Sequence, residues 1–145
     1  MNTIVSKRFF SENVAEIVVE APLIARSRRA GHFVIVRVDK NGERMPLTIA
    51  DADVEKGTIT LVVQRIGVSS SKLCALEPGD QVADLVGPLG KATDIKNFGT
   101  VVCACGGVGA APMWPIAKAL KASGNGIGGS YSRVDYTQGT VGGSL

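Results

Sequence analysis

Alternating hydrophobic and polar positions dominate the first two thirds of the chain. Val34, Val36 and Val38, for example, share one face of an extended strand. Six such segments, each bounded by Gly, Pro, Asn or Asp, cover residues of about 2–9, 13–20, 32–38, 44–50, 57–64 and 80–86. Because their connections are of hairpin length, the pattern predicts a mostly β protein. We expect a six-stranded antiparallel barrel whose interior is filled by one face of each strand.

The pattern changes near residue 98. Residues 100–105 form a continuous apolar run, which is typical of a parallel strand buried on both faces. Residues of about 110–123 then show helical spacing, with apolar side chains and lysines on opposite sides. Together they predict the first βα unit of an α/β nucleotide-binding domain. From Asn125 onward Gly, Ser and Thr dominate, so we expect a flexible tail that buries little surface and a sheet that stops after one parallel strand.

The junction between that strand and that helix is rich in glycine. Glycine permits positive φ and close approach to a phosphate, and a helix start supplies free N–H groups and the positive end of its dipole. Counted from Gly107, the spacing is G-x-G-x-x-P, and proline suits a first helical turn because its missing N–H costs nothing there. The junction is a candidate site for a nucleotide pyrophosphate, with a purely structural turn as the alternative. Its residues are Gly106, Gly107, Val108, Gly109, Ala110, Ala111 and Pro112.

Two further segments contain side chains that could bind a ligand. Arg44, Pro46 and Thr48 share one face of a predicted strand, where a guanidinium matches a phosphate and a hydroxyl can bond a heterocycle nitrogen. The alternative is an edge strand with a solvated arginine. Ser69 and Ser70 precede an apolar helical turn, where hydroxyls either cap the helix or help to bind an anion.

The cysteines and the single histidine indicate structural roles. Cys103 and Cys105 lie on one face of a buried strand, and a four-ligand metal site would need a second pair that the sequence lacks. Cys74 falls in a predicted helix and is expected to be structural. His32 is the only histidine, which argues against catalytic mechanisms that rely on histidine pairs. We expect it to lie where a strand begins. No metal site is predicted.

Composition and charge argue against several classes of protein. The chain has 145 residues and a formal net charge of +3, which is too weak to argue for a nucleic-acid partner. It contains no apolar run close to the ~20 residues of a membrane span, and its N-terminus lacks the features of a signal peptide. Three cysteines fit reduced thiols better than a disulfide framework. These observations predict a cytoplasmic protein without a membrane span.

Five segments occur in an order that is specific to one family. The chain resembles the ferredoxin–NADP reductase superfamily, and most of all its electron-transfer subunits: the small subunit of NADH-dependent ferredoxin–NADP oxidoreductase, sulfide dehydrogenase, and the dihydroorotate dehydrogenase electron-transfer subunit. The resemblance covers residues 1 to about 125. Full-length relatives continue with more βα units, and several carry a C-terminal cysteine cluster for a [2Fe-2S] centre whose ligands are not found here, so we expect a C-terminally truncated fragment. The matching segments are Ala30–Val34, Arg44–Ile49, Gln64–Leu73, Gly87–Gly90 and Gly106–Pro112.

The resemblance implies a domain division and a role for each candidate residue. Residues 1–97 would be a Greek-key FAD-binding barrel, residues 98–124 the incomplete start of an NAD(P)-binding α/β domain, and residues 125–145 an atypical tail. Arg44, Ser69 and Ser70 would then bind the flavin diphosphate. The isoalloxazine would be flanked by Pro46, Leu47 and Thr48, with Thr48 as the catalytic candidate, and lined by Val62, Val63 and Gln64. The segment Gly106–Pro112 would receive the nicotinamide dinucleotide.

The function that the resemblance implies is that of an NAD(P)H-dependent flavin oxidoreductase. NAD(P)H would pass hydride to FAD, and the electrons would continue to an iron–sulfur acceptor: a ferredoxin or a larger flavin and iron–sulfur oxidoreductase subunit. Two alternatives are a non-catalytic barrel interaction module and an inactive truncated reductase. An ordinary NAD-dependent dehydrogenase fragment ranks lower, because no acidic residue stands ~20 positions after the glycine turn. The sequence does not separate NADH from NADPH.

Overall fold

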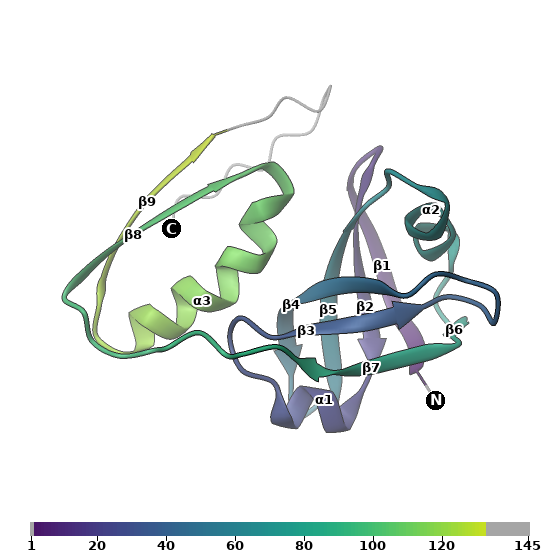
Figure 1. Ribbon diagram of the computed structural model, residues 1–145, viewed down its shortest axis with the longest axis horizontal. Helices are drawn as coiled ribbons and strands as arrows, with labels where there is room; N and C mark the ends of the chain where they lie inside the picture. The colour runs from purple at the N-terminus through teal and green to yellow at the C-terminus, as the bar shows by residue number, and fades with distance from the viewer. Residues whose placement is uncertain (1, 133–145) are drawn as a thin grey trace.

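A barrel-like antiparallel sheet forms the larger part of the protein in the computed structural model, which describes residues 2–132 (Figure 1). Seven strands follow one another in the order β6-β1-β2-β5-β4-β3-β7. Their bounds are β1 Asn2–Ser11, β2 Val14–Glu20, β3 Phe33–Arg37, β4 Met45–Asp53, β5 Thr58–Gln64, β6 Gln81–Val82 and β7 Asp84–Leu89. The mostly β barrel predicted from the alternating pattern is therefore confirmed.

The sixth predicted strand closes the barrel. It is divided at Ala83: β6 pairs with β1 at one edge of the sheet, and β7 pairs with β3 at the other edge. The Ala83 N–H donates to the Val38 carbonyl oxygen at 3.1 Å, which keeps this segment joined to the sheet where it crosses between the edges. One continuous segment thus satisfies both edges, and the six predicted segments appear as seven strands.

The barrel core follows the predicted alternation. Ile59, Leu61 and Val63 on β5 are all essentially inaccessible to solvent, as are Val34 and Val36 on β3. Close packing of such side chains supplies most of the favourable free energy of folding. The core cluster also includes residues from β1, β2, β4 and β6.

Two helices cover the ends of the barrel. The predicted helix is α2, Val68–Ala75, which buries Leu73 and Cys74. A short helix, α1, at Pro22–Ser27 was not predicted; Pro22 at its first position is the local signal that favours it. No helix among residues 2–132 has both the length and the apolar character needed to cross a membrane.

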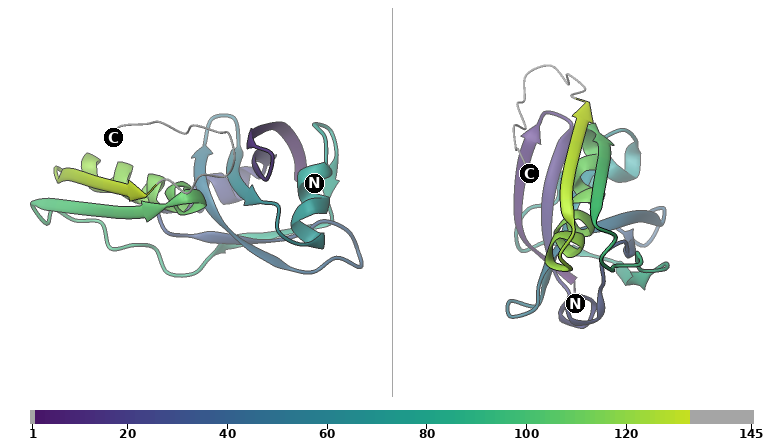
Figure 2. Two further views of the ribbon diagram at one scale, coloured as in Figure 1. Left: turned by 90° about the horizontal axis from the view of Figure 1, so that it is seen from above. Right: turned by 90° about the vertical axis from the view of Figure 1, so that its left-hand side faces the viewer.

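The second unit consists of β8 (Thr100–Gly106), the 3-10 turn η1 (Gly107–Gly109), α3 (Ala110–Ala122) and β9 (Gly126–Ser132). In Figure 1, α3 lies between the β8–β9 ribbon and the barrel, where it contacts β4. Figure 2 shows β8 and β9 side by side along their length. The predicted strand, glycine turn and helix are therefore present in that order.

Two expectations for this unit differ from the structure. Burial of residues 100–105 on both faces is wrong, because α3 covers only the side of Cys103 and leaves Val102 72% exposed. The expectation of a single parallel strand is also wrong: β9 pairs with β8 in unbroken register from Gly126 opposite Thr100 to Ser132 opposite Gly106. Backbone pairing with β8 overrides the poor strand propensity of the glycines. The rest of the predicted tail, residues 133–145, lies outside the described residues.

Asn125 joins the end of α3 to the start of β9. Its side-chain amide is 6% exposed and donates to the carbonyl oxygens of Leu120 at 2.8 Å and Lys96 at 2.9 Å. Its Oδ1 accepts from the Phe98 N–H at 2.6 Å. A buried polar group with three satisfied bonds stabilises the crossover, and it explains why the chain can turn back along β8 at this position.

Candidate functional site

The outer face of β4 and β5 brings four candidate side chains together. The ladder between these strands reaches Ile49 opposite Leu61, and both of these residues point into the core. Side chains alternate along a strand, so Thr48 and Val62, the next residue on each strand, point outward. The same alternation places Pro46 and Gln64 on the outer face. These four residues therefore lie on one outer face of the barrel.

Leu47 and Val63 have a different environment from their neighbours. Val63 is 1% exposed and belongs to the core cluster, and Leu47 packs against that cluster. A ligand on the outer face would reach these two residues through their backbone. Their side chains instead support the strands from inside the barrel.

Arg44 lies just before β4 and has a partly free guanidinium. Its Nη2 is 3.5 Å from Asp84 Oδ2, whereas Arg37 Nη2 approaches the same oxygen at 2.5 Å. Asp84 is thus held mainly by Arg37, and the Arg44 side chain is 56% exposed. A guanidinium that is loosely paired and open to solvent is available to a phosphate.

The N-terminus of α2 uses its two candidate serines differently. The Ser70 hydroxyl accepts from the Ile66 and Gly67 N–H groups at 3.1 and 3.0 Å and donates to the Gly67 carbonyl, so it caps the helix. The Ser69 hydroxyl donates to Glu43 Oε2 at 3.0 Å. The capping interpretation therefore describes Ser70. Ser69 is bonded to a carboxylate in a position where an anionic ligand could be bound instead.

The loop before Arg44 is tied to α2 by a second contact. Lys72 Nζ is 2.8 Å from Asp39 Oδ2, and this hydrogen bond lowers the pKa of the Asp39 carboxyl below its usual value. With the bond between Glu43 and Ser69, it ties residues 39–43 to α2, although the two segments are far apart in sequence. The segment that immediately precedes Arg44 is thus held against the first turn of α2.

These groups fit a diphosphate. The first turn of α2 has no side-chain cap from Gly67, and a Cβ built on Gly67 would meet no atom within 4 Å, so the approach to its N–H groups is open. Free N–H groups, a hydroxyl and a guanidinium are the donors that proteins use for phosphate.

The glycine turn has the predicted geometry. Gly107 has φ of 52°, a conformation that favours glycine, and a Cβ built on Gly109 would meet no atom within 4 Å. Pro112 lies in the first turn of α3, as predicted. The turn η1 also contacts β5, so the N-terminus of α3 lies close to that strand.

The cysteines and the histidine, which were considered as metal ligands or catalytic groups, lie in environments that indicate structural roles. Cys103 is buried and Cys105 is half-buried on the face of β8 toward α3, and burial raises the pKa of the Cys74 thiol. His32 immediately precedes β3, as predicted, and its Nδ1 accepts from the Arg29 N–H at 2.9 Å. Within residues 2–132, no group of three or more His, Cys, Asp or Glu side chains is arranged to hold a metal ion.

Residues 2–93, which form the barrel, match the family described as oxidoreductase FAD-binding domain. The match extends over more than half of the chain, so the protein belongs to this family of FAD-binding oxidoreductase domains. The resemblance inferred from the five ordered segments is thereby confirmed.

Individual relatives point in the same direction. The chain is 42% identical over 127 residues to a homolog of the electron transfer subunit of dihydroorotate dehydrogenase B (NAD(+)) from Thermotoga maritima, covering 88% of this chain and 45% of the relative. The corresponding subunit of Geobacillus thermodenitrificans is 29% identical over 124 residues, covering 81% of this chain and 48% of the relative. The chain therefore spans about half the length of the curated relatives that it matches.

Solved structures support the fold. A structure of the NADH-dependent reduced ferredoxin-NADP oxidoreductase, described in terms of flavin-based electron bifurcation, superimposes with a TM-score of 0.90 at 40% identity, covering 92% of this chain and 48% of that chain. Phthalate dioxygenase reductase superimposes with a TM-score of 0.77 at 22% identity, covering 92% of this chain and 43% of that chain. The second likeness shows the fold alone.

Sequence reasoning missed the carboxylates of this site. Glu43 and Asp84 contact two of the predicted phosphate-binding side chains, Ser69 and Arg44. The contact between Glu43 and Ser69 joins residues 26 positions apart, and no local pattern indicates such a pair. The only sequence signal is that Glu43 directly precedes the candidate arginine.

Proposed function

We propose that the chain provides the flavin-binding part of an electron-transfer flavoprotein that moves electrons between NAD(P)H and an iron–sulfur partner. The observation that carries this proposal is the contact between Glu43 and Ser69, which holds the segment just before Arg44 against the open N-terminus of α2. Family membership and the relatives described above support FAD as the cofactor. Residues 1–97 would form the flavin unit, and β8, η1 and α3 would begin the nicotinamide unit.

Each residue has one task in this proposal. Arg44, the Ser69 hydroxyl and the first turn of α2 bind the flavin diphosphate, while Ser70 keeps that turn in place. Pro46, Thr48, Val62 and Gln64 flank the isoalloxazine, and Thr48 offers its hydroxyl to a ring nitrogen. Leu47 and Val63 hold the strands in register from the core.

The glycine turn has a separate task. Gly106–Pro112 would receive the pyrophosphate of NAD(P)H at the N-terminus of α3, with Gly109 leaving room for the ligand. The contact between η1 and β5 would bring the nicotinamide toward the flavin. FAD, when bound, supplies the change from two-electron hydride chemistry to single-electron transfer, and the protein supplies orientation.

The proposal identifies the electron-accepting partner only by its class of protein. Relatives are named as electron transfer subunits, and one similar structure is described as transferring electrons from pyridine nucleotides to [2Fe-2S]. We infer that an iron–sulfur protein or a larger flavin and iron–sulfur subunit accepts the electrons. Cytoplasmic location is part of the same proposal.

Titration of the full chain with FAD is expected to saturate at one site. The donors described above are preorganised, so binding should quench the flavin fluorescence, with the quenching reaching a plateau at equimolar FAD. Riboflavin, which lacks the diphosphate, is the matched control and should bind much more weakly. Absence of saturable FAD binding by folded protein would contradict the proposal and favour a non-catalytic interaction module.

Replacing Glu43 with glutamine is expected to tighten FAD binding about fivefold. Glu43 carries a negative charge beside the hydroxyl that would contact phosphate. Two like charges ~4 Å apart in water repel by about 1 kcal/mol, which corresponds to about fivefold in affinity. Fluorescence titration at low and high salt measures the effect, which should shrink as salt screens it.

Glu55→Gln is the matched control for this variant. Glu55 is exposed in the turn between β4 and β5, and its substitution makes the same change in net charge. Equal affinities of the two variants for FAD would mean that Glu43 does not compete with the flavin diphosphate.

A further inference from the structure

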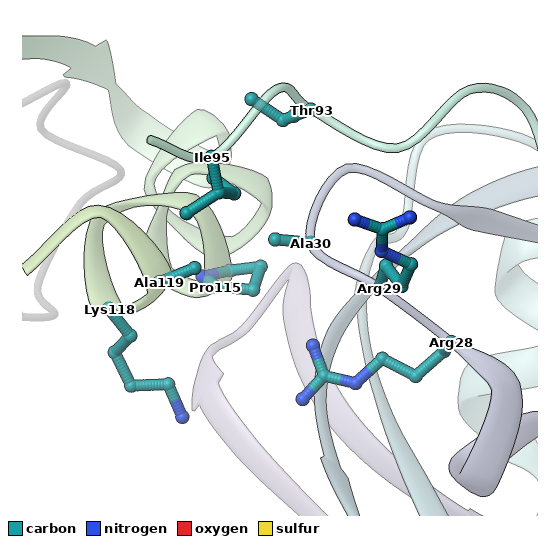
Figure 3. Close-up of a pocket in the computed structure, with 8 residues that line it drawn as sticks. All are labelled: Arg28, Arg29, Ala30, Thr93, Ile95, Pro115, Lys118 and Ala119. Carbon is teal, nitrogen blue, oxygen red and sulfur yellow. The ribbon is translucent and has the colours of Figure 1, made fainter. Parts of the chain in front are cut away.

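A cleft separates the barrel from α3 on a side that holds none of the proposed flavin-binding residues. Its volume is about 460 Å³, which is within the usual range of small-molecule sites. Figure 3 shows its walls: Arg28 and Arg29 come from the segment after α1, and Pro115, Lys118 and Ala119 come from α3. A ligand here would contact both units of the protein at once.

Two cations of the cleft meet on one carboxylate. Asp51 on β4 is 3.3 Å from Arg28 Nη2 and 3.0 Å from Lys118 Nζ, through its Oδ1. The contact shows that a guanidinium from the barrel and an ammonium from α3 already converge closely enough to bind a single oxyanion. The Arg28 side chain is only 17% exposed, so part of this charge is shielded from water.

The cleft retains an excess of positive charge. Arg29 is exposed and has no carboxylate at ion-pair distance among the side chains that the structure describes. Nearby Asp94 is paired with Lys96 at 2.8 Å. Arg28, Arg29 and Lys118 together face the single carboxylate of Asp51, which leaves two positive charges uncompensated.

Apolar side chains complete the wall. Ile95 and Pro115 also line the cleft, and Pro115 is buried. As a proline, Pro115 offers no N–H to a ligand. The site therefore presents charged donors around a small apolar surface, an arrangement that suits a compact anion with a short carbon skeleton.

We propose that this cleft binds a small dianionic oxyanion, either a phosphate monoester or a short dicarboxylate, and that the ligand joins α3 to the barrel. Its two negative charges match the two uncompensated positive charges, and the guanidinium groups provide planar pairs of donors. The site is distinct from the proposed flavin and nicotinamide sites, because neither Arg44 nor the N-termini of α2 and α3 contribute to it.

Titration of the full chain followed by amide chemical shifts tests the proposal. The probes are inorganic phosphate and succinate, with sodium chloride at matched ionic strength as the reference. We expect saturable shifts of the Ala30, Thr93 and Ala119 amides with phosphate or succinate. A stronger response to phosphate identifies a phosphate monoester, and a stronger response to succinate identifies a dicarboxylate. Shifts no larger than those with chloride would overturn the proposal.

Variants separate the cleft from other anion sites. Arg29→Gln should weaken the saturable response at least fivefold, whereas Arg26→Gln, an exposed arginine outside the cleft, should leave it unchanged. Arg44→Ala should also leave it unchanged, because Arg44 does not line the cleft. Lys118→Gln provides a second test from the α3 side. Equal responses of the Arg26 and Arg29 variants, or loss of the response in Arg44→Ala, would overturn the assignment.

Discussion

Replacing Arg44 with alanine is expected to weaken FAD binding by about tenfold to a hundredfold. A charge-assisted hydrogen bond to the diphosphate contributes roughly 1.5–3 kcal/mol, which gives this range of affinity. Arg44→Lys should restore only part of the affinity, because an ammonium lacks the planar pair of donors. Fluorescence titration with FAD measures all three proteins.

The fold should tolerate this change. The Arg44 side chain is 56% exposed, and its contact with Asp84 is long, so its removal leaves that carboxylate paired with Arg37. Arg26→Ala is the matched control, since Arg26 is also exposed but lies in α1. If Arg44→Ala binds FAD as tightly as the Arg26 control, the diphosphate role belongs to another cation, and Lys72 on α2 becomes the next candidate.

Replacing Gly31 with alanine is expected to lower the free energy of unfolding by about 2–5 kcal/mol. Gly31 has φ of 92°, where an L side chain costs roughly 1–2 kcal/mol. A Cβ there would also overlap the Thr93 hydroxyl and lie 3.0 Å from the Thr93 nitrogen, and such overpacking typically costs a further ~1–3 kcal/mol. Urea denaturation measures the loss.

Gly79→Ala separates the two causes. Gly79 has a similar φ of 99°, but a Cβ built on it would meet no atom within 4 Å. This variant should therefore lose only the conformational part, about 1–2 kcal/mol. Equal losses for the two variants would show that the segment around Thr93 moves aside freely. The Thr93 N–H, which donates to the Ala30 carbonyl at 2.9 Å, would then hold that segment only weakly.

Patterns within single segments predicted most of the secondary structure. The alternating valines of β3 and the apolar run of β8 are local patterns that indicate extended structure. Both strands are present where expected. The glycine turn was predictable for a similar reason, because positive φ at Gly107 and proline in a first helical turn are properties of the residues themselves. The pattern missed α1, whose six residues are too few to show a helical period.

The candidate site was predictable only in part. Residue type and order pointed to Arg44 and Thr48, since a guanidinium and a hydroxyl on one strand face suggest ligand chemistry. Leu47 and Val63 were expected beside the isoalloxazine, but alternation along their strands turns both side chains toward the core. Residue type alone left two roles open for Ser70, and only its bonds to Ile66 and Gly67 identify it as a cap.

The sequence by itself determined most of the barrel strands, the glycine turn and the helices α2 and α3, because periodicity, glycine and proline act over a few neighbouring residues. Only the tertiary structure decided how the segment around Ala83 closes the barrel and how the glycine-rich β9 finds a partner in β8. It also decided which charges meet: Asp51 joins cations from α3 and from the segment after α1. Such contacts link residues far apart in the chain, and they form only when the packing of the core has brought their strands and helices together.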